Sequence, residues 1–324
     1  MTITKNIDGI TYEINNDYDN SGNFFISKIE GNTKSIVLPV SIDGKNIAGI
    51  LSSVLRGNKD IENITIPKSY IHLHTSCFER AIGLKNVVFE KGSKIISIPP
   101  RAFLDCINLK NIKLPGTTET INSFAFAGCK SLKSFVSPIE LKRIQLCAFK
   151  FSGIESFHVN EFLKTFPCSV IEGTPCSKIT VEPTNKNFYS KDGVLFSSLN
   201  ELLLYPPGKI NAKYVVPNNI TSIKTHSIQA NDFLKDLIIS DSVKKIEYNA
   251  ILNTNNLKSI TIRSQNTQLE RWALSGIPIN TRIKCPKNYN FMDEIKNQGL
   301  QICTTDRLTS FINDLSAEET KTQK

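Results

Sequence analysis

The sequence has 324 residues, a formal net charge of +9 and 40% hydrophobic residues. This hydrophobic content is enough for a continuous core, but no apolar run reaches the roughly 20 residues that a membrane-spanning helix needs. The positive charge is spread among Glu and Asp residues without dense Lys/Arg blocks. We therefore predict no membrane insertion and no nucleic-acid partner.

The chain begins with a segment that alternates apolar and polar residues between turn-forming stretches. Residues 1–45 include GITYEI and NFFISKI, separated by NNDYDNSGN, which predicts short antiparallel strands that form an N-terminal β cap. The first residues, MTITKNIDGITYEINN, lack the apolar stretch of a signal peptide. Without a signal peptide or an anchor, we expect a cytoplasmic location.

From residue 46 the sequence repeats, over 46–181 and again over 217–285. Apolar residues recur every 23 positions, at Phe103, Phe126 and Phe149 and again at Ile228, Ile251 and Leu274. Each repeat contains an L-x-x-I-x-I strand, a second short strand and an Ala-Phe segment that we expect to form a turn. A fixed period of about 20 to 30 residues with regular leucines is typical of a solenoid, in which each unit buries its apolar face against its neighbours. We therefore expect one elongated array that functions through its surface.

Residues 182–216 break the period. Asp192-Gly193 lies between two alternating segments, which predicts a β-hairpin inserted as an island between repeats. Residues 286–303 predict a closing helix and strand, a C-terminal cap. Residues 304–324 predict a short helix and a disordered tail. In that helix Leu308, Phe311, Ile312 and Leu315 would share one face.

Motifs for chemistry are absent from the sequence. It contains no dinucleotide or phosphate-binding loop, no nucleophile elbow and no H-E-x-x-H. His72 and His74 would share one face of a strand, but no third metal ligand is identifiable. We predict no enzyme, no catalytic residue, no cofactor and no metal.

Eight cysteines are distributed along the chain, several of them in or beside the phenylalanine column. There is no C-x-x-C and no paired Cys/His spacing of the kind that zinc sites use. Because free cysteine is among the most buried residue types, we predict buried thiols. The eight are Cys77, Cys106, Cys129, Cys147, Cys168, Cys176, Cys285 and Cys303.

The phrase LKNIKLPGTTETINSFAFAGC, repeated less completely in its neighbours, resembles the BspA-like class of leucine-rich repeats. The segment NFYSKDGVLFSSLNELLLYPPGK is similar to an insertion found in those proteins, and the resemblance covers about residues 1–303. It implies an α/β leucine-rich-repeat solenoid that is mostly β, a right-handed stack of about ten ~23-residue repeats with terminal caps. It also implies protein interaction or adhesion. Because the family is common among microbial surface proteins, the alternative location is the cell surface, reached by an unconventional route.

The residue between the last two apolar positions of each strand should point away from the core, because side chains alternate along a strand. These residues include no acid and would form a ribbon with an area of roughly 800 Å², about one side of an ordinary interface. They are either good strand formers on an exposed sheet or a site for a protein partner of unknown identity. The positions are Thr65, Val88, Lys113, Val136, His158, Thr180, Ile238 and Thr261.

A column of lysines directly follows the leading leucine of several repeats. It forms either a solvated edge or a stripe that binds an anionic glycan or an acidic protein, although Glu62 and Glu155 occupy the same phase. Its members are Lys85, Lys110, Lys133, Lys235 and Lys258.

The sequence thus predicts a non-enzymatic protein-binding module that recognises its partner on the exposed strand face, with adhesion to host or matrix proteins as one use. The alternatives are an intracellular scaffold for protein complexes, which could use the segment at 308–315, and anionic-glycan binding through the lysine column.

Overall fold

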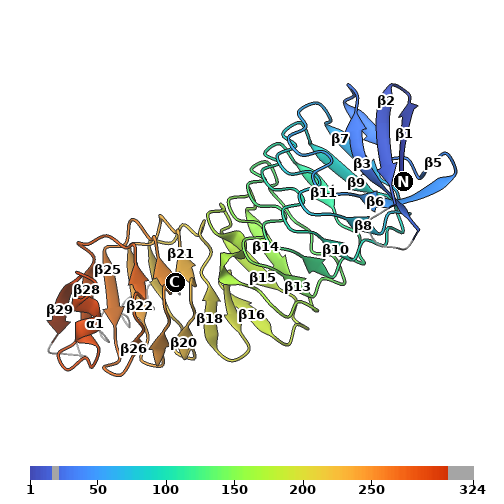
Figure 1. The fold of residues 1–324 in the computed structure, drawn as a ribbon. Helices are drawn as coiled ribbons and strands as arrows, with labels where there is room; N and C mark the ends of the chain where they lie inside the picture. The colour runs from blue at the N-terminus through green and yellow to red at the C-terminus, as the bar shows by residue number, and fades with distance from the viewer. Residues whose placement is uncertain (17–21, 306–324) are drawn as a thin grey trace, which may run out of the picture. The chain divides into compact units, whose positions relative to one another are not determined.

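A computed structural model describes residues 1–16 and 22–305, which form two units, Met1–Gly193 and a second that begins at Val194. Each unit is a β-solenoid of short parallel strands (Figure 1). Aligned residues of neighbouring strands, such as Thr65 and Val88 or Ile238 and Thr261, are 23 positions apart. The mostly β solenoid predicted from the sequence period is confirmed. The predicted helix at 308–315 lies outside the described residues.

Unit 1 begins with three antiparallel strands, β1 (Thr2–Ile7), β2 (Ile10–Asn15) and β3 (Phe24–Glu30). β3 pairs in parallel with β6 (Lys45–Ile50), which is also antiparallel to β5 (Ser41–Ile42). Ile14, Phe25 and Ile26 are fully buried. The antiparallel strands are therefore joined to the solenoid through a buried apolar layer.

One side of unit 1 is formed by the L-x-x-I-x-I strands, and we call it the strand face of unit 1. Parallel pairing links four of these strands in the order β11-β9-β7-β4, and a further pair, β14 and β15, is also parallel. The bounds are β4 (Ser35–Val37), β7 (Asn63–Ile66), β9 (Asn86–Phe89), β11 (Asn111–Lys113), β14 (Ser156–Val159) and β15 (Lys178–Val181). β4 lies within the predicted cap segment yet continues this ladder.

Two-residue strands form a second sheet in unit 1. β8 (His72–Leu73) pairs with β6, and β10 (Ser97–Ile98), β12 (Thr120–Ile121) and β13 (Arg143–Ile144) pair in that order. The Ala-Phe segments of this unit are turns, as predicted, and the 3-10 helix η1 (Cys168–Ile171) follows them. β16 (Phe188–Lys191) ends the unit.

The core of unit 1 contains a column of stacked phenylalanines. The rings of Phe78, Phe103, Phe126 and Phe149 lie 5.0 to 5.2 Å apart, with interplanar angles of 6° to 11°. All four side chains are fully buried. The 23-residue spacing of Phe103, Phe126 and Phe149 therefore corresponds to stacking of their rings in successive turns, and Phe78, 25 residues before Phe103, joins the same column.

Unit 2 opens with the antiparallel pair β17 (Val194–Ser197) and β18 (Glu201–Leu204). The rest of unit 2 has three sides, each a ladder of parallel strands. We call one of them the strand face of unit 2, and its strands lie side by side in Figure 1. The strand face is β19 (Lys213–Val215), β22 (Asp236–Ile239), β25 (Ser259–Ile262), β28 (Arg282–Pro286) and β29 (Gln301–Thr305). The second sheet continues from β18 through β20 (Ser222–Ile223), β23 (Lys245–Ile246) and β26 (Gln268–Leu269). The third side is β21 (Ile228–Gln229), β24 (Ile251–Leu252) and β27 (Leu274–Ser275).

The segment predicted as the C-terminal cap contains the helix α1 (Met292–Lys296) and the start of β29, which extends to Thr305. Among the described residues, no helix is both long enough and apolar enough to cross a membrane.

The corner after each second-sheet strand is made by a residue with positive φ. In unit 2 these residues are His226, Asn249 and Trp272, with φ of 60°, 50° and 59°. Side chains other than Gly, Asn and Asp rarely adopt this left-handed conformation. The sharp corner is therefore imposed by stacking on the neighbouring turn.

The cysteine prediction is confirmed in the phenylalanine column. Cys77, Cys106 and Cys129 are fully buried, and the Cys106 and Cys129 thiols donate to the carbonyl oxygens of Phe78 and Phe103 at 3.0 and 3.1 Å. Burial raises the pKa of the Cys106 thiol to about 12. These thiols behave as small core side chains. Outside the column, Cys176 and Cys285 are buried, Cys147 and Cys168 are half-buried, and Cys303 is exposed.

Candidate functional site

All eight residues predicted on the strand faces are exposed or half-buried, so the alternation argument placed their side chains correctly. In unit 1, Thr65, Val88 and Lys113 are aligned across β7, β9 and β11. Sequence reasoning missed Val37 of β4, which aligns with Thr65 and is 67% exposed. The SIVLP phrase around it carries the same strand pattern one repeat earlier.

The structure brings three of these residues together in one groove of unit 1, the strand-face groove. Val88, Lys113 and Val136 line a cavity of about 910 Å³, together with Lys110 from the lysine column. Val136 lies in a segment that has no regular strand, and it is 71% exposed. Sequence reasoning missed Ile139, which lines the same groove and is 68% exposed.

The groove carries a positive rim. Lys91, Lys110 and Lys113 line it, against the two carboxylates of Glu90 and Glu140. In the part of the chain that the structure describes, none of the three ammonium groups has an ion-pair partner. The groove therefore combines exposed aliphatic side chains with cations whose charge is available to a ligand.

The remaining predicted residues lie elsewhere. In unit 1, His158 aligns with Thr180, and its Nδ1 lies 3.0 Å from the Thr180 hydroxyl while its Nε2 lies 3.4 Å from a Glu182 carboxylate oxygen. In unit 2, Ile238 aligns with Thr261, and both are half-buried. Neither pair lines the strand-face groove.

The lysines of the column lie in neighbouring turns, but only some of them have an acidic partner in the described part of the chain. In unit 1, Lys85 forms an ion pair with Glu62 at 2.8 Å and Lys133 one with Glu155 at 3.4 Å, whereas Lys110 is unpaired among the described residues. Glu62 also lies 3.3 Å from Lys34, and hydrogen bonds from both lysines lower the pKa of its carboxyl. Much of the unit 1 column is therefore neutralised locally.

In unit 2 the positive charges of the column are not balanced by neighbouring carboxylates of the described residues. The amide of Lys258 donates to the Lys235 carbonyl at 2.7 Å, and the amide of Arg282 donates to the Lys258 carbonyl at 2.9 Å. Within residues 1–16 and 22–305, the structure shows no acidic partner for these three side chains. Arg282 aligns with Ser259 and not with Lys258, so it lies beside the column and adds a further cation to it.

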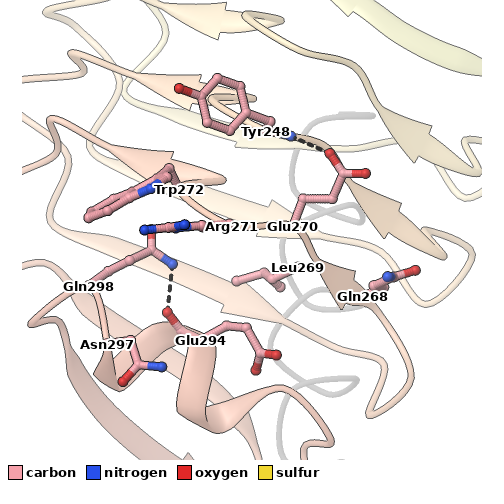
Figure 2. A pocket seen from close by; sticks show the side chains of 9 residues that line it. All are labelled: Tyr248, Gln268, Leu269, Glu270, Arg271, Trp272, Glu294, Asn297 and Gln298. Carbon is pink, nitrogen blue, oxygen red and sulfur yellow. Dashed lines mark hydrogen bonds between the residues drawn. The ribbon is translucent and has the colours of Figure 1, made fainter.

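A second cavity lies in unit 2, where α1 closes the end of the second sheet (Figure 2). We call it the aromatic pocket; its volume is about 880 Å³. Tyr248 and Trp272 line it and are 49% and 44% exposed. The Arg271 guanidinium lies 5.5 Å from the centre of the Trp272 ring. The other lining residues are Gln268, Leu269, Glu270, Glu294, Asn297 and Gln298.

Hydrogen bonds fix the polar side chains of this pocket. A Glu270 carboxylate oxygen accepts a hydrogen bond from the Tyr248 amide at 2.7 Å, and Lys245 binds the other oxygen. Hydrogen bonds from Lys245 and Tyr248 lower the pKa of the Glu270 carboxyl. Gln298 accepts from the Leu274 amide at 3.2 Å and donates to the Glu294 carbonyl at 2.7 Å. Sequence reasoning missed this pocket, although the chain's single tryptophan marks it.

The predicted histidine pair does not lead to a metal site. The rings of His72 and His74 lie 6.2 Å apart. Among the described residues, no group of three or more His, Cys, Asp or Glu side chains is placed to hold a metal ion.

Comparison with known families supports the sequence resemblance. The model for the BspA type leucine rich repeat region matches in six copies, over residues 15–97, 84–197 and 209–312. No curated protein matches the chain.

Solved structures share the fold at low sequence identity. A leucine rich cell surface protein from Faecalibacterium prausnitzii is 20% identical, with a TM-score of 0.62 over 95% of this chain and 96% of that chain. The pneumococcal vaccine antigen PcpA is 20% identical, with a TM-score of 0.65 over 94% and 99%. A leucine-rich repeat protein from Eubacterium ventriosum is 16% identical, with a TM-score of 0.59 over 94% and 85%.

Proposed function

Because this chain belongs to the BspA-type leucine-rich repeat family, we propose that it is a non-enzymatic protein-binding module whose partner occupies the strand-face groove. One observation carries the proposal: Val88, Val136 and Ile139 are 53%, 71% and 68% exposed around a single cavity. Contiguous exposed apolar surface in a soluble protein marks interaction sites. Single exposed aliphatic residues would carry no such weight.

The chemistry of the groove specifies the kind of partner. Its aliphatic floor favours an extended segment with aliphatic or aromatic side chains, because burial of both surfaces stabilises the complex. Lys91, Lys110 and Lys113 favour acidic residues on either side of that segment. The proposed ligand is therefore an apolar protein segment flanked by carboxylates.

The test places a photo-crosslinking benzoylphenylalanine at Val136 in the full chain, in the source cells. A matched control carries the same group at Leu146, which is 59% exposed and follows the second sheet of the same unit. We expect a discrete crosslinked protein from position 136 and none from position 146. Equal crosslinking at both positions, or none at either, would contradict the proposal.

Substitution gives the affinity change. With the crosslinked partner purified, Val136→Glu should weaken binding at least about 30-fold, equal to about 2 kcal/mol, because a carboxylate is desolvated against an apolar segment. Leu146→Glu is the matched control and should bind like the unchanged chain in calorimetry.

The chain could bind its partner either at the cell surface or inside the cell. We propose the cell surface, because two of the solved structures with this fold are a cell surface protein and a vaccine antigen. Surface biotinylation of intact source cells, with a cytosolic protein as the lysis control, checks this expectation. Labelling is the expected result, whereas protection would favour the intracellular scaffold.

Anionic-glycan binding is a second candidate, carried by the unpaired basic column of unit 2. Lys235 and Lys258 occupy equivalent positions of neighbouring turns, and Arg282 lies in the next turn, one position further along its strand. Neighbouring cations attract a polyanion. Replacing all three with Ala should move elution from a heparin column to a clearly lower salt concentration.

The control for this experiment neutralises three exposed lysines outside the column, Lys94, Lys130 and Lys164. It changes the net charge by the same amount. If both triple variants elute together, retention depends on net charge alone and the candidate is rejected.

A further inference from the structure

The aromatic pocket of unit 2 exposes two large rings at one cavity. Tyr248 and Trp272 are 49% and 44% exposed, and the Asn249 amide, directly after Tyr248, donates to the Trp272 carbonyl at 3.1 Å. The rings therefore belong to adjacent turns of the solenoid, and both line the cavity (Figure 2). Burial in the fold does not account for their presence, because neither side chain is in the core.

Trp272 occupies the left-handed corner that recurs from turn to turn. Its φ is 59°, and the equivalent corner of the preceding turn is Asn249, with φ of 50°. Asn adopts this left-handed conformation readily, whereas a bulky ring does so at a cost. The same left-handed corner is occupied by Phe124 and His226 in other turns, so it belongs to the solenoid, and Trp272 is distinguished by the exposure of its ring at the cavity.

The polar groups of the pocket are held in place before a ligand arrives. Gln298 is fixed by hydrogen bonds to the Leu274 amide and the Glu294 carbonyl, and Glu270 by Lys245 and the Tyr248 amide. Preorganised groups lose little entropy on binding.

Two side chains keep hydrogen-bonding capacity for a ligand. The Arg271 guanidinium lies over the Trp272 ring and has no hydrogen-bond or ion-pair partner among the described residues. Asn297, on α1, is exposed and lines the same pocket. Together with the fixed groups they offer both donors and acceptors to hydroxyl groups.

The formal charges around the pocket cancel. Among the lining residues Arg271 is cationic and Glu270 and Glu294 are anionic, and Lys245, outside the lining, pairs with Glu270. This balance gives no net preference for an anion or a cation, which favours an uncharged ligand that is rich in hydroxyl groups. The cavity of about 880 Å³ is within the range of small-molecule sites.

We infer that the aromatic pocket is a binding site for a neutral oligosaccharide, whose C–H faces would lie against the rings of Tyr248 and Trp272. Aromatic rings supply apolar contact area to a ligand that is amphipathic, and the donor and acceptor side chains at the rim bind its hydroxyl groups. This inference is independent of the strand-face groove, which lies in unit 1.

The experiment applies the full chain to a printed array of neutral, sialylated and sulfated oligosaccharides. We expect retention on a set of neutral oligosaccharides. Because Trp272 is the only tryptophan, its fluorescence then reports binding at this pocket directly, in a titration with the best retained glycan. Retention of sialylated or sulfated glycans alone, or of no glycan, would overturn the inference.

Variants distinguish this pocket from any other site. Trp272→Asn suits the left-handed backbone, so it should fold normally by circular dichroism while array binding falls at least tenfold. Tyr248→Ala keeps the fluorophore and should weaken the titrated affinity at least tenfold. Phe124→Asn is the matched control, because Phe124 is also an exposed ring with φ of 59° and lies in unit 1. Unchanged binding by Trp272→Asn would also overturn the inference.

Discussion

Phe126→Ala should lower the free energy of unfolding of unit 1 by about 4 kcal/mol, because truncating a buried phenylalanine leaves a cavity as well as removing apolar burial. The Phe126 ring lies 5.2 Å from both Phe103 and Phe149 and is fully buried. Its loss interrupts the stacked column in the middle, so the turns on both sides lose contact. Urea unfolding followed by circular dichroism measures the change.

The neighbouring Phe124 provides the control, since it is 36% exposed and lies outside the column. Phe124→Ala should cost about 0.5 kcal/mol or less. If the two variants unfold at the same urea concentration, the phenylalanine column does not stabilise the solenoid in the way described.

Asn231→Ala should destabilise unit 2 by about 4 kcal/mol, since four hydrogen bonds of about 1 kcal/mol each are lost. Asn231 is fully buried, and its amide donates to the carbonyls of Pro206 and Lys209 at 3.0 Å each. Its carbonyl oxygen accepts from the amides of Phe233 and Leu234 at 2.9 and 2.8 Å. No water replaces these bonds easily at a fully buried site. The expected fall in Tm is on the order of 10 °C.

Asn255→Ala is the matched control in the same unit. Its amide makes one exposed hydrogen bond, to Asp232 at 3.0 Å, so the expected change in Tm is within about 2 °C. A calorimetric Tm of Asn231→Ala close to that of Asn255→Ala would contradict the role assigned to the buried amide.

The repeat made the fold predictable, because each turn must bury the same positions against its neighbours. The L-x-x-I-x-I pattern located the strand faces, and the spacing of Phe103, Phe126 and Phe149 located the core column. Residues such as Val136 were harder, since the pattern predicts a strand at 132–137 where the chain has no regular strand. Val136 nevertheless lines the same groove as Val88 and Lys113, because successive turns of the solenoid stack on one another. A local pattern does not show this.

The candidate sites were only partly predictable, for a physical reason. Alternation shows which side chains leave the core, and it correctly placed Val88 and Lys113 on the surface. It does not show which surface side chains meet, so Ile139 was missed. The aromatic pocket depends on α1 closing against Tyr248 and Trp272, segments that no local pattern brings together.

The most direct test of the proposed function is amide hydrogen exchange of the full chain. Exchange is compared between the free chain and its complex with the partner that co-purifies with it from the source cells. The expected result is slower amide exchange in β9, in β11 and in residues 134–140, with unchanged exchange in β12 and β13. Protection confined to β12, β13 and the Ala-Phe turns would place the partner on another side of unit 1 and contradict the assignment of the strand-face groove.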